Sequence, residues 1–204
     1  MHAPYYYTEV DGDFVLKIKV SHEFKDTYDS ASVMVTNGLK CWAKCCFELT
    51  DFVTHAAVSM VTKGDSDDAN GCNIEGNTAW LQVCRLGKIF ALHYSADGKN
   101  FYMMRYFHLP VESTVKVGLL AQAPTGDGGI RVYENLSIEK NVIKYQNRKI
   151  IYHTKSCNPE KDYSFIIHFP LFKSSSALFS VISLSDSPEI ILAISLFLSS
   201  NSKA

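Results

Sequence analysis

The sequence shows little sign of a segment that would carry the chain to or across a membrane, and we expect none. Its first residues, MHAPYYYTEVDGD, lack the apolar stretch of a secretory signal. Nowhere does the chain reach the run of about 18 apolar residues that a membrane-spanning helix needs. We therefore expect a cytoplasmic protein with no membrane contact, whose six cysteines remain free thiols in a reducing compartment.

The chain also has no excess of charge of either sign. The 20 Lys and Arg side chains oppose 21 Asp and Glu side chains, which leaves a net charge of −1. This balance excludes a nucleic-acid binder held by phosphate contacts, so we expect no nucleic-acid partner. The hydrophobic share of 47% is enough for an ordinary core and excludes a disordered chain.

Glycine is absent from the last part of the chain, because all 11 glycines lie between Gly12 and Gly129. The charge changes in the same region. Residues 1–139 hold 12 basic and 17 acidic side chains, a net of −5, whereas residues 140–204 hold 8 and 4, a net of +4. These shifts predict a domain over residues 1–139 and a poorly ordered or adventitious Ser-rich tail over residues 140–204.

Amphipathic helical patterns are absent, and short alternating segments separated by turn residues take their place. This pattern predicts an all-β sandwich or barrel. The clearest hairpin signal is Asp97-Gly98 between two alternating segments, because a tight primed turn needs positive φ. We interpret Lys63–Gly76 as a connecting loop. The predicted strands are Phe14–Val20, Ala31–Thr36, Cys41–Leu49, His55–Thr62, Trp80–Leu86, Ile89–Ser95, Phe101–His108, Val115–Ala121 and Arg131–Ile138.

The sequence lacks the motifs of metal sites and of nucleophilic catalysis. It has no C-x-x-C pair and no His pair at zinc-finger spacing, so we expect no metal and no cofactor. The adjacent Cys45 and Cys46 point to opposite faces of a strand and are interpreted as buried thiols. The one acidic cluster, Glu9, Asp11 and Asp13, runs into a turn at Gly12 and favours a solvated bend over a catalytic carboxylate pair.

The predicted strand Cys41–Leu49 carries the most informative pattern. Its alternation places an apolar set toward the core and a second set, Trp42, Lys44, Cys46 and Glu48, on the opposite face. An aromatic ring beside polar groups is a common way to hold a sugar. We therefore predict ligand-binding roles for Trp42, Lys44 and Glu48, and for Arg105 if its strand shares the sheet. The alternative is an exposed tryptophan beside a Lys–Glu pair of little energetic weight.

Five segments in order resemble a known family: YDSASVMV at Tyr28–Val35, WAKCCFE at Trp42–Glu48, VSMVTKGDSDD at Val58–Asp68, HYSADG at His93–Gly98 and VKVGLLA at Val115–Ala121. They resemble the uncharacterised concanavalin A-like β-sandwich family that includes the regulation-of-enolase protein. The resemblance covers about residues 5–139. It implies a two-sheet antiparallel jelly-roll sandwich, related in shape to lectins and glucanases, with no established activity.

The chain departs from this family in three places. Ser32 stands where the family usually has glycine, strands that precede Tyr5–Gly12 in the family are absent, and the resemblance ends after Glu139. A truncated product at one end, and a retained intron or shifted reading frame at the other, would explain the last two. We expect the irregular tail, including the apolar segment Ile190–Leu198, to be dispensable. The alternative is that the tail covers a sheet edge left open by the absent strands.

Together these observations predict a non-enzymatic cytoplasmic β-sandwich that binds a carbohydrate-like ligand or a protein partner. The resemblance to a regulatory protein points toward the regulation of sugar metabolism. The rival hypotheses are a glycoside-acting enzyme of the glucanase type, which needs two carboxylates at one sugar bond, and a pure protein-interaction module.

Overall fold

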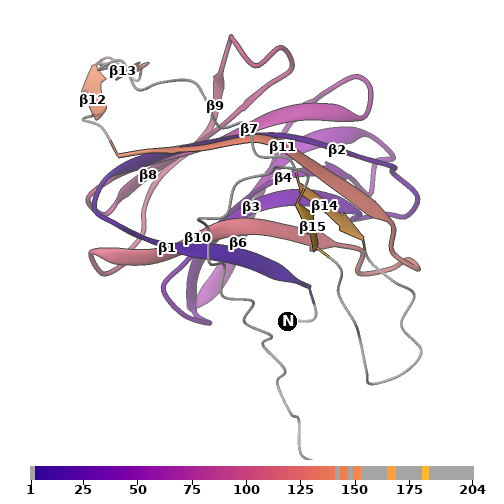
Figure 1. Ribbon diagram of the computed structural model, residues 1–204, viewed down its shortest axis with the longest axis horizontal. Helices are drawn as coiled ribbons and strands as arrows, with labels where there is room; N and C mark the ends of the chain where they lie inside the picture. The colour runs from indigo at the N-terminus through magenta and orange to yellow at the C-terminus, as the bar shows by residue number, and fades with distance from the viewer. Residues whose placement is uncertain (1–2, 141–142, 147–148, 153–164, 169–180, 184–204) are drawn as a thin grey trace, which may run out of the picture.

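The computed structural model describes residues 3–140, 143–146, 149–152, 165–168 and 181–183, with side chains for residues 3–140. Every regular element in these ranges is a β-strand. Two antiparallel sheets stack face to face, as Figure 1 shows. The predicted fold class, an all-β two-sheet antiparallel sandwich, is therefore confirmed. Among the same residues, no helix has the length and apolar character needed to cross a membrane.

The first sheet has six strands, and the chain enters it at one edge and leaves it for the other sheet several times. Each strand pairs antiparallel with its neighbours. The spatial order of the strands is β1 (Tyr5–Asp11), β10 (Thr114–Gln122), β3 (Ser30–Thr36), β4 (Cys41–Leu49), β5 (His55–Lys63) and β6 (Asp65–Asn73).

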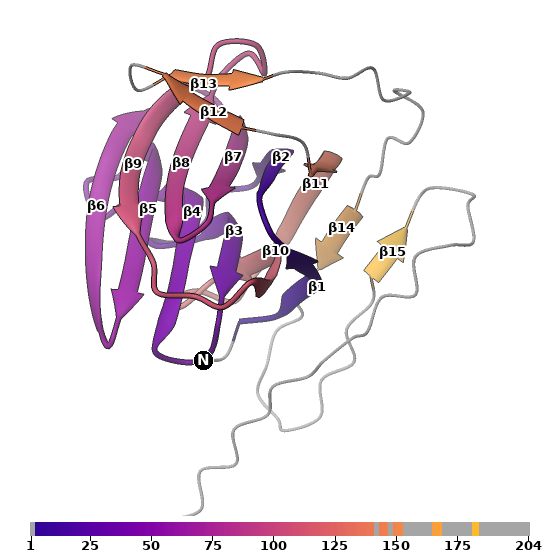
Figure 2. The same ribbon diagram turned by 90° about the vertical axis from the view of Figure 1, so that its left-hand side faces the viewer.

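The second sheet has seven strands, also antiparallel, and a separate hairpin follows the last long strand. The hairpin consists of β12 (Ile143–Gln146) and β13 (Lys149–Tyr152). The order of the sheet is β15 (Val181–Ser183), β14 (Phe165–His168), β11 (Ile130–Glu139), β2 (Phe14–His22), β7 (Thr78–Leu86), β8 (Ile89–Ser95) and β9 (Tyr102–His108). Figure 2 shows this sheet from the side on which β9 lies beside β6.

All nine predicted strands are present, but β1, β6 and the four short strands β12 to β15 were not predicted. The interpretation of Lys63–Gly76 as a loop is wrong, because β6 occupies Asp65–Asn73 and pairs with β5. Asp, Asn and Gly have low strand propensity, so the segment DSDDANGCN does not resemble a strand. It is nevertheless a suitable edge strand, since exposed charges at a sheet edge discourage pairing with other chains.

The core between the sheets is built from the apolar positions of the alternating strands. Phe14, Leu16, Ile18 and Val20 of β2 are all fully buried there. On the opposite sheet Ala43, Cys45 and Phe47 face the same core, as the alternation of β4 predicted. Each sheet therefore turns one face to the core and the other face outward.

A polar cluster joins the two sheets at one end of the core. Arg131 of β11 and Asp29, which immediately precedes β3, form a fully buried ion pair with 3.0 Å between Nη2 and Oδ1. The same Nη2 donates to the Gln122 carbonyl at the end of β10, at 2.8 Å. Nearby, the Tyr133 hydroxyl donates to the Leu120 carbonyl at 2.7 Å and accepts the Ser32 amide at 3.3 Å. Two side chains of β11 thus fix both β3 and β10.

The glycine of the VKVGLLA segment allows β1 to lie close to β10. A Cβ atom at Gly118 would collide with the Tyr6 carbonyl oxygen and with the Tyr7 Cα atom. Gly118 is paired with Tyr7 on one side and with Met34 on the other. The absence of a side chain at this position therefore lets the edge strand β1 complete the six-stranded sheet.

Two strands of the C-terminal part extend the seven-stranded sheet. β14 pairs with β11 from Ile130 opposite His168 to Tyr133 opposite Phe165, and β15 pairs with β14. Their backbones therefore lie along the edge of β11. From the sequence alone, it is open whether the tail covers a sheet edge. The predicted tail segment Ile190–Leu198 lies outside the described residues, and the division of the chain at Glu139 stays a prediction.

We expect Tyr133→Phe to lower the free energy of unfolding by about 1–3 kcal/mol, because two buried backbone groups lose the hydroxyl that bonds them. Urea denaturation at neutral pH measures the change. Tyr102→Phe is the matched control, since the Tyr102 side chain is 58% exposed. Equal stability of the two variants would show that the Tyr133 hydroxyl does not hold β3 and β10.

Candidate functional site

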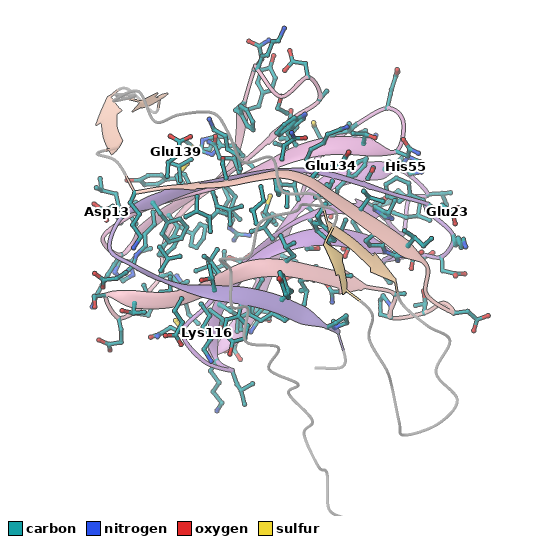
Figure 3. The ribbon with its side chains drawn as sticks, in the orientation of Figure 1. Asp13, Glu23, His55, Lys116, Glu134 and Glu139 are labelled. Atoms are coloured by element: carbon teal, nitrogen blue, oxygen red, sulfur yellow. The ribbon has the colours of Figure 1, made fainter. Side chains whose placement is uncertain are left out.

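The outer face of the six-stranded sheet is the face turned away from the core, and it carries the predicted site on β4. Trp42, Lys44, Cys46 and Glu48 alternate with the core residues of this strand, so all four lie on the outer face. Lys116 of β10 lies on the same outer face, and Figure 3 shows it below the sandwich, opposite Glu134 and Glu139 of the seven-stranded sheet. The structure therefore brings three of the four predicted residues onto one face.

Lys44 lies across the middle of this face. It is 6% exposed, and its Nζ donates to the side-chain carbonyl of Gln122 on β10, two strands away. Gln122 was not among the predicted residues, because its position on this face depends on the order of strands. The bond holds the ammonium group over the sheet and directs it toward β10, away from β5 and β6.

Glu48 lies at the end of β4, on the same face as Lys44, and is 5% exposed. Burial raises the pKa of its carboxyl group to about 7, the Lys44 charge lowers it, and the charges of Asp68 and Asp51 raise it further. Among the described side chains, none forms a hydrogen bond with Glu48. A desolvated carboxyl group of this kind is typical of functional sites, although structural charges also produce it.

Arg105 does not lie on this face, contrary to the placement predicted from the sequence. Its strand, β9, is the edge of the seven-stranded sheet, whereas β4 lies inside the other sheet. The Arg105 Nη2 forms an ion pair with the Asp67 carboxylate of β6 at 2.6 Å, and Nη1 donates to the Asp67 carbonyl at 3.1 Å. The prediction assumed a shared sheet, and the order of strands instead makes Arg105 a bridge between the two sheet edges.

A small apolar cluster lies beside Lys44 and Glu48 on the outer face. It is separate from the main core and consists of Cys46 of β4 with Ala56 and Val58 of β5, against which the half-buried Met60 packs. The three buried members are at most 2% exposed. These three side chains are therefore closed to a ligand, and Met60 is the member of the cluster that remains partly exposed.

Along the free edge, β6 adds a row of exposed polar side chains to the outer face. The register pairs Thr62, Met60, Val58 and Ala56 of β5 with Ser66, Asp68, Asn70 and Asn73. These four polar residues are all exposed. The sequence analysis missed them because β6 was interpreted as a loop. The sequence has no alternation that could have identified them, because Asp65 and Asp67 are polar as well.

The other carboxylates considered as catalytic candidates lie on β1 and in the turn that follows it. Glu9 is exposed on the edge strand β1, Asp11 accepts the Thr114 hydroxyl at 3.2 Å, and Asp13 accepts the Gly87 amide at 2.6 Å. Within the described part of the chain, no group of three His, Cys, Asp or Glu side chains is placed to hold a metal ion. The described cysteines are free thiols: Cys41, Cys45, Cys46, Cys72 and Cys84.

Two buried histidines are part of the structure of the sandwich. His22 contacts the Phe47 carbonyl at 3.0 Å through Nε2, and burial together with the Arg131 charge lowers its pKa to about 4. His93, on the outer face of the seven-stranded sheet, lies 3.4 Å from the Gln82 amide, and burial lowers its pKa to about 4 as well. Both rings are therefore neutral at pH 7 and serve as packed polar groups.

We expect Glu48→Gln to change how stability depends on pH. The Glu48 pKa is higher in the folded state than the ordinary value of about 4.3, so folding binds a proton and stability falls as pH rises from about 4.3 to 7. The fall is roughly 3 kcal/mol and should vanish in the variant. His22 and His93 act with the opposite sign between about pH 4 and 6.5, so the measured quantity is the difference between the two proteins.

Urea denaturation of both proteins at several pH values from 4 to 8 gives this difference. The parent protein should lose stability relative to Glu48→Gln as pH rises. Parallel curves for the two proteins would contradict the assignment of a desolvated carboxyl group at Glu48.

Comparison with solved structures places the sandwich among known folds. A functionally unknown protein from Saccharomyces cerevisiae is 25% identical, covers 67% of this chain and 74% of its own, and superposes with a TM-score of 0.61. Weaker similarity joins the chain to the GH43 protein BlXynB from Bacillus licheniformis, at 13% identity over 56% of this chain and 25% of that one, with a TM-score of 0.49.

The exoplasmic/lumenal domain of VIP36, in a form bound to Ca2+ and Man3GlcNAc, is 9% identical over 72% of this chain and 74% of that one, with a TM-score of 0.42. Similarity at this level carries no information about a shared site. No curated protein sequence matches the chain. A family of proteins of unknown function, DUF1349, matches residues 1–141. This match spans more than half of the sequence, and the chain belongs to the DUF1349 family.

Proposed function

We propose that this protein is a carbohydrate-binding β-sandwich without enzymatic activity, and that it binds its ligand on the outer face of the six-stranded sheet. The observation that carries the proposal is the environment of Glu48. Its carboxyl group is buried, has a raised pKa and has no hydrogen-bond donor among the described side chains. The Glu48 oxygens accept no hydrogen bond from the described side chains, and a ligand rich in hydroxyl groups would supply donors.

The surroundings of Glu48 support a sugar as that ligand. Trp42 lies half-buried at the other end of β4 and offers an aromatic surface for stacking. Asn70 and Asn73 of β6 add exposed amides, which both donate and accept hydrogen bonds. An aromatic surface combined with a few directed polar groups is the usual composition of a small-molecule site.

The charge of the face favours a neutral sugar. Asp68 is exposed and acidic, and it would repel a uronic acid or a sulfated sugar. Lys44 carries a positive charge on this face, but its ammonium group donates to Gln122 of β10, on the side away from β6. We therefore propose neutral glycans as the ligand class.

The spacing of the acidic groups supports binding without hydrolysis. Glycosidases hold two carboxyl groups roughly 5–9.5 Å apart at one sugar bond. Asp68 is level with Lys44, so the backbones of Asp68 and Glu48 are offset by about 13 Å along the strands and about 10 Å across them. This offset favours separate carboxyl groups over a catalytic pair, even though the Asp68 charge raises the Glu48 pKa. A glycoside-acting enzyme remains the alternative function, and it would require these two groups to converge.

The cellular role is a further part of the proposal. The free thiols, among them the buried neighbours Cys45 and Cys46, support a reducing compartment such as the cytoplasm. The resemblance of the motifs to the regulation-of-enolase protein supports a role in sugar metabolism. A non-enzymatic protein that binds a sugar could make this regulation respond to the sugar concentration.

A protein partner is the second candidate, and the edge strand β9 favours it. Tyr102 and Tyr106 of this strand are 58% and 55% exposed. Tyrosine is enriched in protein interfaces because its ring buries a large area while its hydroxyl remains bonded. This surface lies on the other sheet, so binding there would be independent of Trp42 and Glu48.

We expect Trp42→Ala to abolish retention of the full chain on a neutral glycan array while leaving its thermal midpoint nearly unchanged. Trp80→Ala is the matched control, because Trp80 lies on the outer face of the seven-stranded sheet, where its ring packs against Gly98. The control should retain glycan binding. A stability loss of about 3–5 kcal/mol in Trp42→Ala would instead identify this tryptophan as structural.

A further inference from the structure

Building on the proposed function, we propose that the ligand is a linear neutral glycan of several sugar units that lies along β4, β5 and β6. The inference concerns the length of the ligand and its direction on the sheet. It rests on the separation of Trp42 from Glu48, on the buried apolar cluster in the middle of the face and on the polar row of β6.

The two ends of the site are far apart. Trp42 and Glu48 lie on the same face of β4 and are six residues apart, which corresponds to about 20 Å along the strand. Their register confirms that the strand is continuous between them, since Trp42 pairs with Thr62 and Glu48 with Ala56 of β5. One monosaccharide cannot contact both residues, so a ligand that uses both must be extended.

The middle of the face offers few groups to a compact ligand. Lys44 is bonded to Gln122, and Cys46 and Val58 are buried in the small apolar cluster. A short sugar held only there would find no free hydrogen-bonding side chain of β4. The accessible groups of the middle are the half-buried Met60 and the polar side chains of β6 beyond it.

The polar row runs the full distance between the two ends. Ser66 is opposite Thr62 near Trp42, Asp68 and Asn70 follow, and Asn73 is opposite Ala56 near Glu48. Successive members from Ser66 to Asn70 are about 7 Å apart along the strand, because each is the next residue on that face. A polar group repeated along one line fits a ligand whose hydroxyl groups also repeat along its length.

The chemistry of this row distinguishes a glycan from other extended ligands. The exposed acidic group at Asp68 disfavours nucleic acids and acidic polysaccharides. Amides at Asn70 and Asn73 can each donate and accept at once, as bonds to hydroxyl groups require. The Glu48 carboxyl group, which accepts no hydrogen bond from the described side chains, marks the far end of the track.

The test is a calorimetric titration of the full chain with neutral cello-, xylo- and manno-oligosaccharides, each as monomer, dimer, tetramer and hexamer. We expect Kd to fall at least tenfold from dimer to hexamer in the series that binds. The double variant Asn70→Ala/Asn73→Ala should lose most of this gain. The control Lys99→Ala, in the turn between β8 and β9, should keep it.

The titration has three outcomes, and each decides differently between the inference and the proposed function. A length-dependent Kd that the double variant flattens supports the inference. A monosaccharide that binds as tightly as its hexamer overturns the inference and leaves the proposed function intact. Absence of binding by every glycan overturns the proposed function and the inference together.

Discussion

The buried ion pair between Asp29 and Arg131 is the constraint on which the sandwich depends. Both side chains are fully buried, and they join β11 of one sheet to the start of β3 in the other. Such a pair gains little over apolar packing, but removal of one partner leaves a buried charge and costs about 3–5 kcal/mol. Arg131 Nε and Nη1 have no hydrogen-bond partner within the described residues, so the ion pair is what compensates the guanidinium charge.

This connection also extends to the outer face of the six-stranded sheet. Arg131 donates a hydrogen bond to the Gln122 backbone carbonyl. The side-chain oxygen of Gln122 accepts a hydrogen bond from the Lys44 ammonium group on the outer face. Gln122 in turn pairs with Ser30, and Ser30 pairs with Glu48. The buried polar cluster and the polar outer face are thus connected through Ser30 of β3, Glu48 of β4 and Gln122 of β10.

The sequence predicted the features that alternation within one strand determines. In β4 the apolar residues identify the core face, and Trp42, Lys44 and Glu48 share the other face by their spacing alone. Features that depend on the order of strands were missed. β6 has low strand propensity and is stabilised by pairing with β5. Gln122 lies on the outer face near β4 only because its strand, β10, pairs with β3. Arg105 was misplaced because its spacing gives no information about which sheet β9 joins. The raised pKa of Glu48 likewise depends on burial by neighbouring strands.

The most direct test of the binding face is amide hydrogen exchange on the full chain, with and without a saturating neutral glycan that the protein retains. If the outer face of the six-stranded sheet binds the ligand, added protection should concentrate in β4, β5 and β6. The edge strand β6 should show the largest change, because its free edge exchanges fastest without a ligand. Protection confined to β7, β8 and β9 would contradict the account and would place the site on the other sheet.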